Sequence, residues 1–109
     1  MRESGVRLLV YGTGLATLGL LLAHLAVVFL GPGGFHGDLG YDSVRGQLAQ
    51  VPYFVALGAL LVLALTHGWL GLRRTLLDAH VGPHGLAALT VVACVTTGAL
   101  LYLYVLTWP

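Results

Sequence analysis

Charged residues are missing from three long stretches of the chain, which apolar residues fill instead. These stretches cover residues 8–37, 47–72 and 85–109. Each supplies the roughly 20 apolar residues that cross the hydrocarbon core of a bilayer as a helix. Turn-forming residues interrupt the pattern at 31–34 and 82–83, and such residues bound helices. The pattern predicts an all-α membrane protein, a single membrane-anchor domain over 1–109, with three transmembrane helices at about 6–30, 52–78 and 84–108.

The composition agrees with a membrane-embedded chain. Of the 109 residues, 58% are hydrophobic and 8% are charged, whereas about a quarter of positions are charged in a typical soluble domain. The formal net charge of +1 gives no reason to expect a nucleic-acid partner. The single cysteine, Cys94, excludes an internal disulfide and a haem attached through a Cys-x-x-Cys-His motif.

The arginines are distributed unevenly between the two sides of the membrane. Arg2 and Arg7 precede the first span, Arg73 and Arg74 follow the second, and Arg45 alone lies in the connection between them. Because cationic segments stay in the cytoplasm, we expect a cytoplasmic N-terminus and an external C-terminus. The first uncharged run is longer than the apolar region of about 7–15 residues in a secretion signal, so we expect it to be retained.

The external connection contains few candidates for chemistry. Residues 41–50 are predicted to form a short interfacial helix that starts after Asp42 or Ser43. His36 and Asp38 offer two potential metal ligands, but a site needs three or four, so solvation is the favoured interpretation. Three aromatic residues near the end of the third span are expected to form a belt at the outer interface: Tyr102, Tyr104 and Trp108.

Small residues form a stripe along the first span. Gly12, Ala16, Gly19 and Ala23 recur at spacings of four, three and four, which places them on one face of a helix. Such a face lets another helix approach closely in lipid. The approaching helix can belong to a partner chain or to this chain, and the sequence leaves both open.

Polar residues form a second stripe, at the end of the second span. With 100° per residue, Gly71, Arg74 and Asp78 lie within about 40° of His67, whereas Arg73 points well away. His67 lies about 10 Å inside the cytoplasmic boundary marked by Arg74, at 1.5 Å per residue. An ionisable side chain at that depth usually has a partner and often a function.

Two interpretations of His67 remain open at this point. The imidazole can hydrogen-bond to a hydroxyl or a carbonyl on a neighbouring helix. Alternatively, its Nε2 can be the axial ligand of a b-type haem held between helices. In that case Gly71 leaves room for the flat macrocycle, and the Arg74 guanidinium matches the geometry of a haem propionate.

The segment 67–80, HGWLGLRRTLLDAH, resembles a known signature. It is similar to the His-x-x-x-Gly-(x)n-Asp-Tyr motif of the small, cytochrome b-type membrane anchor of succinate dehydrogenase (succinate:quinone oxidoreductase, complex II). His67, Gly71 and Asp78 stand at the matching positions. The three spans, the His24-containing first helix and the Gly-Gly-Phe-His segment at 33–36 also resemble that family, so the likeness covers nearly the whole chain.

The resemblance implies a set of roles and partners. His67 would be an axial ligand of haem b, and the second membrane anchor of the complex would supply the other axial histidine. Asp78 would lie near the quinone site, close to the iron–sulfur subunit. The family tyrosine after the aspartate is Ala79 here, and His80 is the alternative quinone contact, although its side chain is expected about 100° away.

His24 lies at a different depth from His67. It is 17 residues beyond Arg7, hence about 25 Å from the inner boundary, so the two histidines differ in depth by roughly 15 Å. That separation is too large for both to bind one haem, and each needs a partner of its own. Through the resemblance His24 fits a second haem near the outer face, and otherwise it hydrogen-bonds to a hydroxyl such as Thr17. His84 is expected to be an interfacial residue.

We therefore expect a haem b-binding anchor subunit of succinate dehydrogenase, part of a multi-subunit helical bundle in the cytoplasmic membrane of a prokaryote. It would tether the flavoprotein and iron–sulfur subunits and support electron transfer to quinone, with one haem or two. The sequence has no dinucleotide fingerprint and no cysteine pattern for an iron–sulfur cluster. A haem-free structural anchor of another respiratory complex is the alternative. A transporter is disfavoured because no carboxylate lies within a span.

Overall fold

The computed structural model describes residues 3–30 and 40–109, and these residues form four α-helices. Three of them are long enough and apolar enough to cross a membrane: α1 (Glu3–Leu30), α4 (Val51–Asp78) and α5 (Pro83–Val105). The fourth, α3 (Tyr41–Leu48), is short. The bounds of the three long helices lie within three residues of the predicted ones, so the predicted all-α architecture is confirmed.

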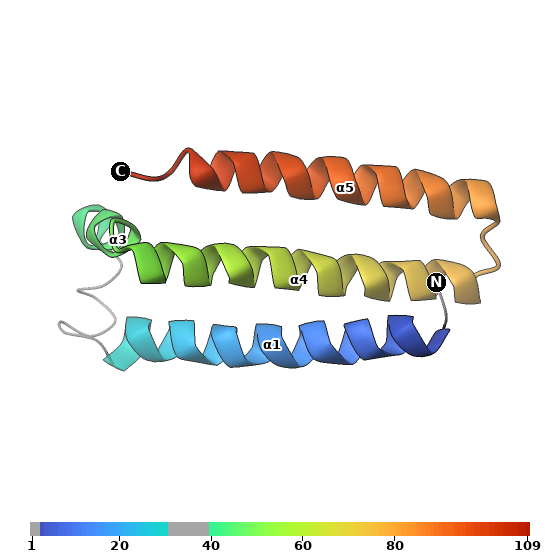
Figure 1. Ribbon diagram of the computed structural model, residues 1–109, viewed down its shortest axis with the longest axis horizontal. Helices are drawn as coiled ribbons and strands as arrows, with labels where there is room; N and C mark the ends of the chain where they lie inside the picture. The colour runs from blue at the N-terminus through green and yellow to red at the C-terminus, as the bar shows by residue number, and fades with distance from the viewer. Residues whose placement is uncertain (1–2, 31–39) are drawn as a thin grey trace.

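The long helices form a single antiparallel layer with α4 in the middle (Figure 1). Helix α4 packs against α1 on one side and α5 on the other, and within the described ranges no Cα atoms of α1 and α5 come within 8 Å. The start of α1, the end of α4 and the start of α5 share one end of the layer, whereas α3 and the C-terminus share the other (Figure 1). Arg7, Arg73 and Arg74 belong to the first end and Arg45 to the second.

Most apolar side chains of this layer face outward. Leu8 and Leu15 are each 73% exposed, and in the described parts of the chain Val6 is the only buried hydrophobic residue. Water would not tolerate such a surface, but lipid is as apolar as leucine and imposes no such cost. The layer therefore depends on close packing and on hydrogen bonds between helices rather than on an apolar core.

The small-residue stripe on α1 lies on a face that α4 does not cover. A Cβ added at Gly12 or at Gly19 would meet nothing within 4 Å among the described residues. Of the two origins considered for the approaching helix, the described part of this chain does not supply one at either glycine. A helix of another chain can use this face.

Helix α3 starts earlier than predicted. The prediction relied on a side-chain cap from Asp42 or Ser43, but the helix begins at Tyr41 after Gly40, which gives no side-chain cap. Instead the backbone N–H of Val44 donates to the Gly40 carbonyl at 2.9 Å. The first turn is thus closed by main-chain atoms alone.

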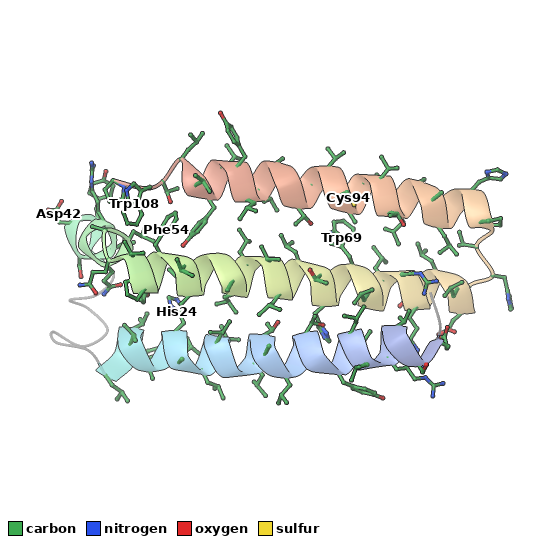
Figure 2. The ribbon with its side chains drawn as sticks, in the orientation of Figure 1. His24, Asp42, Phe54, Trp69, Cys94 and Trp108 are labelled. Atoms are coloured by element: carbon green, nitrogen blue, oxygen red, sulfur yellow. The ribbon has the colours of Figure 1, made fainter. Side chains whose placement is uncertain are left out.

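At the outer end, Phe54 of α4 joins α5 and the C-terminal residues. The Tyr104 ring stacks on Phe54 with centroids 4.5 Å apart, and its hydroxyl donates to the Phe54 carbonyl at 2.6 Å. Trp108 meets Phe54 edge-on at 4.8 Å, as Figure 2 shows. Gly58 makes the approach possible, because a Cβ there would lie 3.0 Å from Cε1 of Tyr104. Within the predicted aromatic belt, Tyr102 is 65% exposed, whereas Tyr104 packs inward.

Replacing Tyr104 by phenylalanine keeps the ring stack and removes only the bond to the Phe54 carbonyl. We expect Tyr104→Phe to lower the free energy of unfolding by about 0.5–1 kcal/mol, the usual value of a hydrogen bond between membrane helices. Reversible unfolding of the detergent-purified protein measures it. Tyr102→Phe is the control and should leave stability unchanged. Equal effects of the two substitutions would contradict the role assigned to the Tyr104 hydroxyl.

Candidate functional site

The centre of the candidate site is His67, which α4 presents to α1. Its Nδ1 lies 3.0 Å from the carbonyl oxygen of Val10 and 3.3 Å from Oγ1 of Thr13. The ring also lies against Gly14, where an added Cβ would come within 2.8 Å of Cε1. One short segment of α1 therefore holds the imidazole.

The Val10 carbonyl determines which ring nitrogen carries the proton. A carbonyl oxygen only accepts hydrogen bonds, so Nδ1 of His67 must be the donor at 3.0 Å. The Thr13 hydroxyl donates to the Leu9 carbonyl at 2.6 Å, which leaves its oxygen able to accept from Nδ1 as well. In the neutral ring Nε2 then bears a lone pair.

Nε2 of His67 has no hydrogen bond among the described residues. It is also not one of their fully enclosed polar atoms that lack a partner, which are Thr17 Oγ1 and Trp69 Nε1. The nitrogen therefore reaches the surface of this chain with its lone pair free. This is the arrangement of a metal-binding histidine, in which the second ring nitrogen donates to a carbonyl or carboxylate.

The remaining members of the predicted polar stripe lie at the open side of α4. A Cβ added at Gly71 would meet nothing within 4 Å among the described residues, so the surface one turn from His67 is free for a flat ligand. Arg74 and Asp78 are exposed. No ion pair engages Arg74 or Asp78 in residues 3–30 and 40–109.

The arginines at the inner end differ from the sequence-based expectation. Arg73 was expected to point well away from the stripe, but it is half-buried and lines a small hollow between α1 and α4 together with Arg74. Glu3 and Arg7 of α1 line the same hollow. The expectation for Arg73 was wrong because it considered α4 in isolation, and the first turns of α1 extend far enough to reach both arginines.

These residues fit one axial half of a haem site. The chain offers an imidazole nitrogen with a free lone pair, an open surface at Gly71 and a guanidinium toward the membrane boundary at Arg74. A second axial nitrogen is not nearby, since the described residues contain no group of three His, Cys, Asp or Glu side chains that could hold a metal. A ligand from another chain must complete such a site.

His24 has a different partner from His67, as its predicted depth required. Its Nδ1 lies 3.0 Å from the Tyr53 hydroxyl of α4, and Figure 2 shows it between α1 and α4 in the half nearer α3. The expected partner Thr17 was wrong, because the Thr17 hydroxyl is enclosed without a hydrogen bond. A hydroxyl both donates and accepts, so Tyr53 does not determine the tautomer of His24.

The hollow beside His24 is apolar and small. It has a volume of about 110 Å³ and is lined by residues of α1 and α4 that are aliphatic apart from His24 and Tyr53. The lining residues are Leu20, Ala23, His24, Val27, Tyr53, Ala56, Leu57 and Leu60.

The candidate quinone contacts lie where α4 ends. Asp78 is the last residue of the helix, and His80 follows in the left-handed conformation, with φ of 60°. The N–H groups of His80 and Val81 donate to the carbonyls of Leu77 and Leu76, each at 3.0 Å, and so cap the helix. His80 has thus left the helical path on which its direction was predicted. Both Asp78 and His80 are exposed.

Two other predicted positions have simpler outcomes. His84 is exposed in the first turn of α5. His36 and Asp38 lie outside the described residues.

Sequence reasoning missed the residues of α1 that hold His67. A usable signal existed, because Gly14 lies seven residues after Arg7 and His67 lies seven residues before Arg74. On antiparallel helices whose arginines mark the same boundary, these positions have the same depth. Depth alone predicts the neighbourhood of Thr13 and Gly14 but not which of them faces the ring.

Comparison with known proteins gives one match. The family model described as succinate dehydrogenase/fumarate reductase transmembrane subunit matches residues 2–107. Neither the curated proteins nor the solved structures give a match.

The contact between Gly14 and His67 predicts a difference between two glycines of one helix. A methyl group at Gly14 would displace the imidazole from the Val10 carbonyl, whereas a methyl group at Gly12 meets nothing. Both substitutions gain the same helix propensity, so we expect Gly14→Ala to be less stable than Gly12→Ala by about 1–3 kcal/mol. Equilibrium unfolding in detergent measures the difference. Equal stabilities would show that the imidazole does not rest on Gly14.

Proposed function

The chain belongs to the family of succinate dehydrogenase/fumarate reductase transmembrane subunits, and from that premise we propose that it binds a b-type haem through Nε2 of His67. It is a multi-pass membrane protein and a subunit of an oxidoreductase complex. In that complex we propose that it is the small, cytochrome b-type membrane anchor.

The observation that carries the proposal is the hydrogen bond from Nδ1 of His67 to the Val10 carbonyl at 3.0 Å. It fixes the tautomer whose Nε2 is ready to bind a metal without first losing a proton. It also fixes the orientation of the ring before any ligand arrives. A histidine retained only for packing needs no free nitrogen at the surface of its own chain.

Other residues of this chain support the same site. Gly71 leaves the surface beside His67 open, and Arg74 is free of ion pairs in the described residues and can receive a propionate. A histidine of the second membrane anchor is the proposed second axial ligand. The open face at Gly12 and Gly19 is suited to a helix of such a partner. When bound, the haem supplies a one-electron redox centre.

The proposal limits this chain to one haem. The partner of His24 is a hydroxyl, which leaves the proton on either ring nitrogen, so the feature that supports His67 is missing at His24. Its hollow of about 110 Å³ is far smaller than the roughly 300–1,000 Å³ typical of sites for larger ligands.

In the assembled complex the chain tethers the flavoprotein and iron–sulfur subunits to the cytoplasmic membrane of a prokaryote. The end that carries Arg7, Arg73 and Arg74 is proposed to face the cytoplasm, following the rule for cationic segments. Asp78 at this end is the proposed contribution to the quinone site. Ala79 provides no hydroxyl for a quinone carbonyl, so the partner chains supply the principal contacts, with His80 exposed nearby.

The haem-free anchor is the second candidate, and one observation favours it. Nδ1 of His67 and Nδ1 of His24 both have hydrogen-bond partners, so neither imidazole is an unpaired polar group in lipid. In this case both histidines only join α1 to α4. The two functions differ at Nε2 of His67, which binds iron in one and lipid in the other.

Removal of the proposed ligand distinguishes the two functions. We expect the reduced-minus-oxidised optical spectrum of the purified complex to contain a low-spin b-haem signal that His67→Ala abolishes. His84→Ala is the control, since His84 is an exposed histidine in the first turn of α5, and it should retain the signal. A spectrum without haem, or one unchanged by His67→Ala, rejects the proposal.

The same spectrum counts the haems associated with this chain. Because His24 is not a proposed ligand, His24→Ala should retain the full amplitude per complex of the wild-type signal. Loss of about half of that amplitude would show a second haem at His24 and would contradict the limit to one.

A further inference from the structure

We propose that Thr13 is a positioning residue that strengthens electron donation from His67 to the iron and so lowers the midpoint potential of the haem. The inference rests on the proposed haem ligation by His67. It adds a role for a residue of α1 that does not itself touch the ligand.

The first support is the direction of the Thr13 hydroxyl. Thr13 is 9% exposed, and its Oγ1 lies 2.6 Å from the Leu9 carbonyl. A carbonyl has no proton to give, so the hydroxyl proton is committed to Leu9 and the lone pairs of Oγ1 remain available. Nδ1 of His67, at 3.3 Å, is the donor they face.

The second support is that Nδ1–H has two acceptors. The Val10 carbonyl at 3.0 Å is the closer one, and Oγ1 of Thr13 adds a second, longer contact in a three-centre arrangement. The Val10 acceptor is main-chain and is present whatever side chain stands there. Thr13 is therefore the side chain through which the sequence can adjust the polarity around Nδ1.

The effect on the iron follows from ligand basicity. Acceptors at Nδ1–H draw the proton away from the ring and raise the electron density at Nε2. A more basic nitrogen stabilises the ferric state, with its higher charge, more than the ferrous state. Removing one of the two acceptors therefore favours the ferrous state and raises the potential, since hydrogen bonding around the axial ligand is one of the ways a protein tunes haem.

The test compares three variants of the purified complex by redox titration of the b-haem spectrum. Thr13→Val removes the hydroxyl at nearly constant shape, and Thr13→Ser retains it. Thr17→Val is the matched control, because Thr17 is one turn further along α1 and its enclosed hydroxyl has no hydrogen-bond partner in the described structure.

We expect Thr13→Val to raise the midpoint potential through a change of up to about tenfold in the ferrous-to-ferric preference, which equals about 59 mV for one electron. Thr13→Ser and Thr17→Val should stay at the wild-type potential. If Thr13→Val does not assemble, Thr13→Ala removes the same hydroxyl without adding bulk and should show the same rise.

The outcomes separate this inference from the proposed function. Haem that is lost in His67→Ala but keeps its wild-type potential in Thr13→Val or Thr13→Ala overturns the role of Thr13 and leaves the ligation intact. An equal shift in Thr17→Val also overturns it, because the effect would then be one of general packing. Haem that survives His67→Ala overturns the proposed function itself.

Discussion

A carbonyl oxygen accepts hydrogen bonds and never donates them, and this constraint at Val10 governs the candidate site. Because Nδ1 of His67 lies 3.0 Å from that oxygen, the ring proton belongs on Nδ1 and the lone pair belongs on Nε2. The close approach of Gly14 allows the ring to reach the carbonyl. The pairing of α1 with α4, the tautomer and the free nitrogen therefore have one physical origin.

The flat arrangement of the helices explains how such a nitrogen stays available. Helix α4 separates α1 from α5, so no third helix in the described structure closes over the open side of His67 and Gly71 (Figure 1). In a three-helix bundle with all helices in mutual contact, more of these surfaces would be enclosed. A layer whose apolar faces are uncovered instead suits a protein that packs in lipid against other chains, in agreement with its family of transmembrane subunits.

Much of the fold could be predicted from the sequence, because the spans follow from hydropathy and from breakers such as Pro32 and Gly82. The polar stripe of His67, Gly71 and Arg74 could be predicted too, since it needs only the helical repeat. The partners could not, because the rotation of one helix against another depends on packing between side chains far apart in sequence. For that reason Thr13 was missed, Tyr53 rather than Thr17 is the partner of His24, and Arg73 shares a hollow with α1.

The account as a whole depends on what lies at Nε2 of His67, and an electron cryo-microscopy map of the purified complex observes that position directly. The account predicts density for an iron porphyrin that is continuous with Nε2, with Nδ1 still directed at the Val10 carbonyl and a histidine of another chain on the opposite side of the iron. Density for lipid or for an ordinary side chain at Nε2 would contradict it.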